Sequence, residues 1–163
     1  AFFYPDFSQD VHYECELVLR VSREGKFIKE KFAKSYLDGI GLGIDFTARD
    51  LQQEAKEKGH PWTLAKMFNH SAAISKFDSL DDFPDLQNVH FEMSLNGETK
   101  QKGHTADMIF PVETLIAYIT RFITIKKGDL IFTGTPAGVG GVTKGDRIEA
   151  SLEGKKKLDF YVR

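Results

Sequence analysis

The stretch Gly43-Ile44-Asp45-Phe46-Thr47-Ala48-Arg49-Asp50-Leu51-Gln52 combines an apolar approach, one aspartate and the start of a helix. Thr47 has the side chain of a helix N-cap, and Asp50 follows three residues later, where the acidic partner of a capping box lies. The helix is expected to run to about Lys58, where a glycine follows. The pattern therefore predicts that Asp45 lies between a strand and a helix, where a rigid scaffold can point one side chain toward a cleft.

Two further carboxylates, Glu14 and Glu16, lie in the stretch Tyr13 to Val21, whose alternation predicts a strand with both acids on one face. With Asp45 they offer three hard oxygen ligands from two elements, a set that suits Mg²⁺ or Mn²⁺ and leaves positions open for water or substrate. Zinc is a poorer match, because no Cys pair or His pair occurs at ligand spacing. A solvated strand face is the alternative, and spacing alone does not decide between the two.

The rest of the chain predicts one α+β domain, mostly β, with two main helices. Alternation over residues 89–95 followed by Asn96-Gly97 is typical of a hairpin. Pro111 begins the second helix, with a buried stripe that is expected to extend to Phe122 and Ile123. Further strands are expected at 129–133, 147–152 and 158–162. No internal repeat or linker divides the chain, which predicts a single domain over residues 1–163.

Composition excludes several classes of function. The chain has 163 residues, of which 41% are apolar, and a formal net charge of −2. Its Lys and Arg residues are scattered, so we expect no nucleic-acid partner, and no apolar run is long enough for a membrane span. A single cysteine, Cys15, excludes an internal disulfide and favours a reducing, cytoplasmic location.

Further residues are candidates for contacts with a substrate. Lys66 interrupts an apolar run. It is either a fixed cation that stabilises negative charge developing on a substrate oxygen, or a lysine that buries its aliphatic stem and keeps its charge in solvent. Arg49 and Gln52 share a helix face and can hold a carboxylate and a carbonyl, or lie in solvent. The glycine-rich loop 134–141 lacks the ending of a P-loop, but its backbone N–H groups, or the hydroxyl of Thr133 or Thr135, can face an anion.

Six segments together resemble the fumarylacetoacetate hydrolase superfamily, and in particular its acylpyruvate hydrolase-like branch. They occur in the family order and span nearly the whole chain. The segments are Tyr13-Glu14-Cys15-Glu16-Leu17, Asp45-Phe46-Thr47-Ala48-Arg49-Asp50-Leu51-Gln52, Trp62-Thr63-Leu64-Ala65-Lys66, Asn96-Gly97-Glu98, Gly103-His104-Thr105-Ala106-Asp107-Met108-Ile109-Phe110 and the glycine-rich run from Gly128 to Gly140.

The resemblance implies a mixed β-sheet roll, a homodimer, and hydrolysis of C–C bonds in acylpyruvate or fumarylacetoacetate-type 2-oxo acids. It implies Mg²⁺ or Mn²⁺ as the cofactor, held by Glu14, Glu16 and Asp45. It also gives Lys66 the role of supporting the reacting carbonyl or oxyanion. Catalytic or substrate contacts are implied for the polar residues Arg49, Gln52 and Thr135.

One feature of the family is absent from the sequence. Hydrolases of the family activate water with a His and a Glu on an N-terminal lid, and no histidine here matches. The chain opens at Ala1 without a methionine, so we expect such a segment to precede it. The alternatives are a 2-oxo acid decarboxylase or enol–keto isomerase, which need only the enolate stabilised, or a catalytically silent metal-binding dimerisation module.

Overall fold

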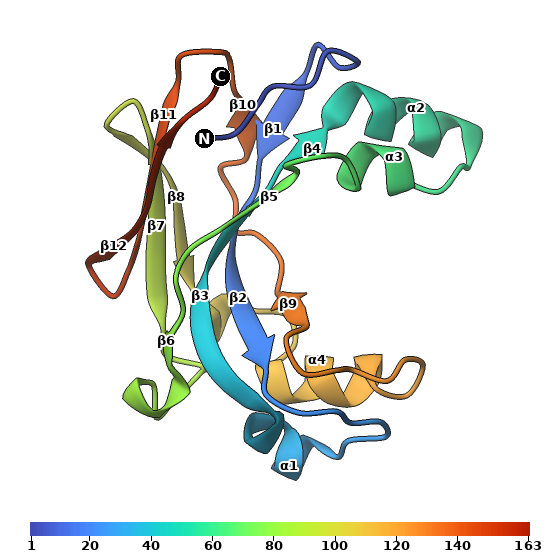
Figure 1. Cartoon of the computed structure of the whole chain (residues 1–163), viewed down its shortest axis with the longest axis vertical. Coiled ribbons are helices and arrows are strands. Elements are labelled where there is room, and N and C mark those ends of the chain that lie inside the picture. The colour runs from blue at the N-terminus through green and yellow to red at the C-terminus, as the bar shows by residue number, and fades with distance from the viewer.

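Three β-sheets form the frame of the computed structural model, which describes residues 1–163 (Figure 1), and all pairs of named strands are antiparallel. The first sheet has the order β5-β3-β2-β9, with β6 also paired to β3, the second β12-β11-β7-β8 and the third β10-β1-β4. The strands are β1 (Val11–Tyr13), β2 (Cys15–Val21), β3 (Leu37–Asp45), β4 (Thr47–Ala48), β5 (Ala72–Ile74), β6 (Asp78–Ser79), β7 (His90–Leu95), β8 (Glu98–His104), β9 (Leu130–Phe132), β10 (Gly140–Gly141), β11 (Arg147–Leu152) and β12 (Lys155–Tyr161).

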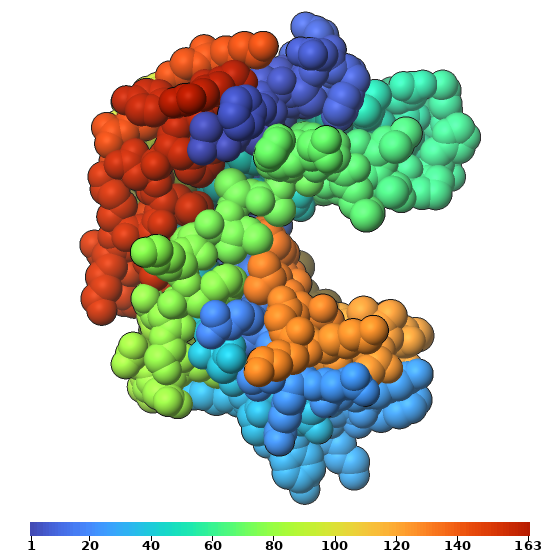
Figure 2. All heavy atoms as spheres, viewed as in Figure 1, coloured from blue at the N-terminus to red at the C-terminus, as the bar shows by residue number.

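The helices lie in two groups on one side of this frame (Figure 1). The two longest are α2 (Arg49–Lys58) and α4 (Val112–Ile119), and α1 (Glu30–Ala33) and α3 (Thr63–Lys66) have one turn each. The predicted α+β, mostly β architecture with two main helices is therefore confirmed. Figure 2 shows that the surface is hollowed between the α2–α3 group and the group formed by α4 and α1.

The core is built around β2 and β3. All residues of β2 except Arg20 are buried, and β3 presents glycines at 39, 41 and 43 toward its neighbours. A Cβ atom at Gly43 would lie 2.5 Å from the Phe132 ring and 2.8 Å from the Val18 side chain. The missing side chain lets Phe132, at the end of β9, pack directly on the β3 backbone, which draws the loop after β9 toward the tip of the sheet.

The capping box predicted from Thr47 and Asp50 is wrong. Thr47 lies in β4, pairs with His12, and its side chain does not cap α2. The Asp50 carboxylate instead accepts hydrogen bonds from Ser8 Oγ and from the backbone N–H of Gln9. A tertiary contact with the N-terminal segment therefore replaces the local cap and holds the start of α2 against β1.

The hairpin prediction is confirmed, and the second helix is shorter than predicted. Asn96 and Gly97 both have positive φ, 54° and 82°, as a tight two-residue turn between β7 and β8 requires. Helix α4 ends at Ile119, and the backbone N–H and buried hydroxyl of Thr120 both bond the Ile116 carbonyl in its last turn. Phe122 and Ile123 lie beyond this end and are exposed, so their assignment to the buried stripe is wrong.

Candidate metal centre

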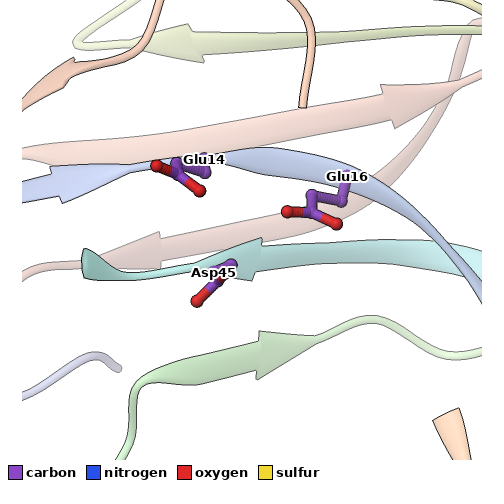
Figure 3. A group of neighbouring side chains, drawn as sticks. All are labelled: Glu14, Glu16 and Asp45. Atoms are coloured by element: carbon purple, nitrogen blue, oxygen red, sulfur yellow. The ribbon is translucent and has the colours of Figure 1, made fainter. Parts of the chain in front are cut away.

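Three carboxylates converge where β1 gives way to β2 and where β3 ends (Figure 3). Glu14 lies between β1 and β2, Glu16 lies in β2 opposite Gly43, and Asp45 is the last residue of β3. The Asp45 backbone N–H donates to the Glu14 carbonyl at 2.8 Å, which fixes the two residues side by side. One oxygen from each of the three side chains lies within 4.8 Å of the others. The structure thus brings together the three acids that the sequence singled out.

Two cations and one backbone N–H hold these carboxylates. Lys66 Nζ, at the end of α3, lies 2.7 Å from Glu14 Oε2 and 2.7 Å from Asp45 Oδ2. Arg49 donates to the other oxygen of Glu14 at 2.7 Å. Gly134 N, in the loop after β9, donates to Glu16 Oε2 at 2.7 Å. Lys66 is therefore fixed by ion pairs to Glu14 and Asp45. Its role in stabilising an oxyanion stays a prediction.

The acids differ in how their surroundings shift their pKa values. Burial raises the pKa of Glu16 to about 7, because the only donor to its carboxylate is the Gly134 N–H and two more acids are close. Burial also raises the pKa of Asp45, although the Lys66 ammonium offsets part of this effect. Glu14 is partly buried as well, but hydrogen bonds from Lys66 and Arg49 lower its pKa overall. The ion pairs outweigh desolvation at Lys66, whose pKa is raised, so its amine is protonated at neutral pH.

The donor set fits a hard divalent cation. All three side chains offer carboxylate oxygens, and Glu16 Oε1 and Asp45 Oδ1 accept no hydrogen bond within the chain. Mg²⁺ and Mn²⁺ prefer such oxygens and keep some positions for water or substrate. Cys15, between the two glutamates, is fully buried in the core and takes no part in the site. When all three acids are ionised they outnumber the two cations, and the resulting net negative charge favours a bound cation.

Arg49 and Gln52 form a second layer around Glu14 on the first turn of α2. Arg49 contacts Gln52 Oε1 through one guanidinium nitrogen, at 2.7 Å, and Glu14 through another. Gln52 is buried, with 3% of its surface exposed, rather than solvated as the commoner case for a helix polar residue would be. Its amide nitrogen makes no hydrogen bond within the chain. The Gln52 N–H₂ group is therefore left free to donate to water or to a ligand.

Thr135 lies next to the acids but its hydroxyl is already engaged. Its Oγ1 donates to the Cys15 carbonyl at 2.8 Å and accepts from Gln101 Nε2 at 2.8 Å. Sequence reasoning did not single out Gln101, which is 1% exposed. The only signal for it was its position in the alternating strand β8, where it shares a face with buried Gly103 and lies between two lysines.

A cavity of about 550 Å³ borders the loop that carries Gly134 and Thr135. Its other walls come from the end of β8 and the segment after it, with single residues from β2, β7 and α4. They combine apolar side chains such as Met108, Phe110 and Leu115 with the polar side chains of Lys102 and His104.

None of the helices has the length and apolar character needed to cross a bilayer.

The fold and this acidic centre define a domain of one enzyme family. A family model described as "Fumarylacetoacetate (FAA) hydrolase C-terminal" matches residues 1–163. The chain belongs to the fumarylacetoacetate hydrolase family, as its six sequence segments predicted.

Relatives with assigned activities are enzymes of more than one reaction type. The mitochondrial oxaloacetate tautomerase FAHD1 of Rattus norvegicus is 42% identical over 158 residues, which are 97% of this chain and 72% of that protein. The mitochondrial oxaloacetate decarboxylase of Dictyostelium discoideum is 44% identical over 147 residues, 90% of this chain and 67% of that protein. The solved fumarylpyruvate hydrolase of Pseudomonas aeruginosa, in complex with Mn²⁺ and pyruvate, is 33% identical with a TM-score of 0.94, over 99% of this chain and 69% of that chain.

Proposed function

We propose that residues 1–163 form a catalytic domain that binds Mg²⁺ or Mn²⁺ through Glu14, Glu16 and Asp45 and acts on a small 2-oxo acid through its enol or enolate form. The leading reaction is the interconversion of the keto and enol forms of a substrate like oxaloacetate. The observation that carries the proposal is the convergence of three carboxylates around a single fixed ammonium group, that of Lys66.

The residues around the acids have complementary tasks in such a reaction. When bound, the divalent ion supplies Lewis-acid polarisation of the 2-oxo group. Lys66 is held protonated by its two ion pairs, so it acts as a donor to a developing oxyanion and not as a base. Gln52, through its free amide N–H₂ group, can orient a substrate carboxylate or carbonyl. Arg49 holds the Gln52 side chain in place by donating a hydrogen bond to its Oε1.

Tautomerisation is placed first because of the named relatives. The rat and mouse proteins that share 42% and 41% identity with this chain are oxaloacetate tautomerases. Keto–enol exchange needs a proton transfer and a stabilised enolate, and the donors described above supply the stabilisation of the enolate.

Hydrolysis of an acylpyruvate C–C bond is the second candidate. The Pseudomonas aeruginosa fumarylpyruvate hydrolase holds Mn²⁺ and pyruvate, the 2-oxo acid part common to acylpyruvates. The same platform would stabilise the pyruvate enolate that leaves when this bond breaks. Decarboxylation of oxaloacetate produces the same enolate, and the Dictyostelium discoideum relative is named for that reaction.

Three assays on one preparation separate these reactions. The chelator-treated protein is given Mn²⁺, and the decay of enol absorbance of oxaloacetate is followed together with pyruvate release. Loss of enol without pyruvate indicates a tautomerase, both together a decarboxylase, and pyruvate release from an acylpyruvate a hydrolase. Asp45→Asn, which keeps the shape of the side chain and removes its charge, should abolish all three. Wild-type protein that binds Mn²⁺ but turns over none of these substrates would support the silent metal-binding module.

Two further expectations stay predictions. The homodimer implied by the family resemblance is to be tested by sedimentation of the protein. The cytoplasmic location was inferred from the lone cysteine, but Cys15 is buried and protected from oxidants by the core. The rat, mouse and Dictyostelium discoideum relatives are named as mitochondrial proteins.

A further inference from the structure

Gln101 lies at the point where three parts of the acidic centre meet. Its side chain leaves β8, in the second sheet, and reaches across to the start of β2 in the first sheet. Its Oε1 accepts the Cys15 backbone N–H at 2.9 Å, and its Nε2 donates to Thr135 Oγ1 at 2.8 Å and to the Pro136 carbonyl at 2.9 Å. Only 1% of its surface is exposed, so these bonds are made in a dry environment where each unmade bond would be costly.

The amide replaces a missing strand next to Cys15. Strand β9 pairs with Val18, Leu19 and Arg20 of β2, and the backbone N–H of Thr133, the next residue, donates to the Leu17 carbonyl. At Cys15 no strand lies on that side. Instead, the Cys15 N–H donates to Gln101 Oε1, and the Cys15 carbonyl accepts a hydrogen bond from the Thr135 hydroxyl. That hydroxyl in turn accepts a hydrogen bond from Gln101 Nε2. These side chains therefore hold the one residue that separates Glu14 from Glu16.

The same amide holds the loop that carries the donor to Glu16. Gly134 N donates to Glu16 Oε2, and the next two residues, Thr135 and Pro136, are those bonded by Gln101. Close packing further along confirms that this loop is seated on β8. Gly138 has φ of +100°, and a Cβ atom there would meet the carbonyl of Lys100, the neighbour of Gln101.

We infer that Gln101 is a positioning residue for the acidic centre: it sets the spacing of Glu14 and Glu16 and aims the Gly134 N–H at Glu16, and thereby sets the affinity of the site for a divalent cation. The inference rests on the proposed metal-binding function. Outer partners of metal ligands typically change metal affinity by about 10–100-fold when they are removed.

Titration calorimetry with Mn²⁺ alone tests this on the whole chain after chelator treatment. Gln101→Leu keeps the approximate size of the side chain and removes all three bonds, and should weaken Mn²⁺ binding by about 10–100-fold. The matched control is Gln87→Leu. Gln87 also bonds backbone groups of two segments, the Thr105 carbonyl and the Val112 N–H, but none of its partners belongs to the acidic centre. Both variants should lower the melting temperature, and only Gln101→Leu should change the affinity for Mn²⁺.

The outcomes separate the inference from the proposed function. A folded Gln101→Leu protein whose Mn²⁺ affinity is within about threefold of wild type, below the range expected for such partners, overturns the inference and leaves the proposed function standing. Wild-type protein without Mn²⁺ binding overturns the proposed function and the inference with it. If Gln101→Leu does not fold, Gln101→Glu decides, because it keeps the acceptor for the Cys15 N–H and loses the two donors. It should bind Mn²⁺ more weakly than wild type, and equal affinity overturns the inference.

Discussion

Replacement of Lys66 by Met should tighten the binding of Mn²⁺ while turnover falls. The ammonium nitrogen lies 2.7 Å from oxygens of Glu14 and Asp45, two of the three acids that can hold the ion. An ion at normal ligand distance from the same oxygens would lie about 4–5 Å from this nitrogen. The repulsion between a divalent ion and a unit charge at that distance is about 2 kcal/mol at the dielectric constant of water and several times more in a drier site.

The repulsion sets a lower limit for the effect. Since 1.4 kcal/mol corresponds to a factor of ten, Lys66→Met should bind Mn²⁺ at least about tenfold more tightly than wild type. Turnover should fall by about 10²–10³-fold, because a preorganised donor to the oxyanion is lost. Calorimetry with Mn²⁺ and a steady-state assay on the same protein measure the two effects.

Lys58→Met is the matched control for this experiment. It removes the same charge from an exposed pair with Glu54 on α2, where solvent and salt screen it, so neither quantity should change. Equal or weaker Mn²⁺ binding by a folded Lys66→Met protein would refute the reasoning. It would mean that the lysine leaves the acids when the ion enters, or that the ion binds elsewhere.

Further predictions concern Glu16 and Gly43. Folding raises the pKa of the Glu16 carboxyl from 4.5 to about 7, so the metal-free protein loses stability as the pH rises through this window. Replacement by the neutral Glu16→Gln side chain removes this loss. At pH 8 the variant should be more stable than wild type by up to about 3 kcal/mol in urea unfolding. Below about pH 7, Mn²⁺ must displace the proton on the Glu16 carboxyl. The affinity of the wild-type protein for Mn²⁺ should therefore rise by up to about tenfold per pH unit below pH 7 and stay constant above it. An affinity that does not change with pH would contradict a ligand role for Glu16. Gly43→Ala places a Cβ atom 2.5 Å from the Phe132 ring and should cost about 1–3 kcal/mol in thermal unfolding, whereas an unchanged midpoint would show that the ring yields freely.

The sequence was sufficient for the parts of the site that depend on local pattern. The alternation of apolar and polar residues predicted that Glu14 and Glu16 point to the same side of one strand, and the end of an apolar run predicted that Asp45 lies at a strand terminus. Because β2 and β3 are neighbours in an antiparallel sheet, these signals meet within a few residues of the same point. The capping box predicted for α2 was wrong because the actual partners of Asp50 are distant in the sequence. Its partners, Ser8 and Gln9, lie about 40 residues away from Asp50 and carry no local signal.

Long-range hydrogen bonds account for most of what the sequence could not show. Gln101 and Cys15 are separated by 86 residues, and Gly134 and Glu16 by 118. A glutamine in an alternating strand has the same appearance whether it faces solvent or spans two sheets. Only the packing of the second sheet against the first decides this, and no periodicity encodes that packing.

The hydrogen bonds at the site also change which residues are best placed to recognise a substrate. Arg49 is engaged by Glu14 and Gln52, and the Thr135 hydroxyl proton is given to the Cys15 carbonyl. Both were candidates for substrate contacts, and both now face a cost for leaving a partner. The Gln52 amide N–H₂ and the Lys66 ammonium have donors that no group of the chain satisfies. Under the proposed function, these two donors are therefore the ones available to the carboxylate and developing oxyanion of a 2-oxo acid.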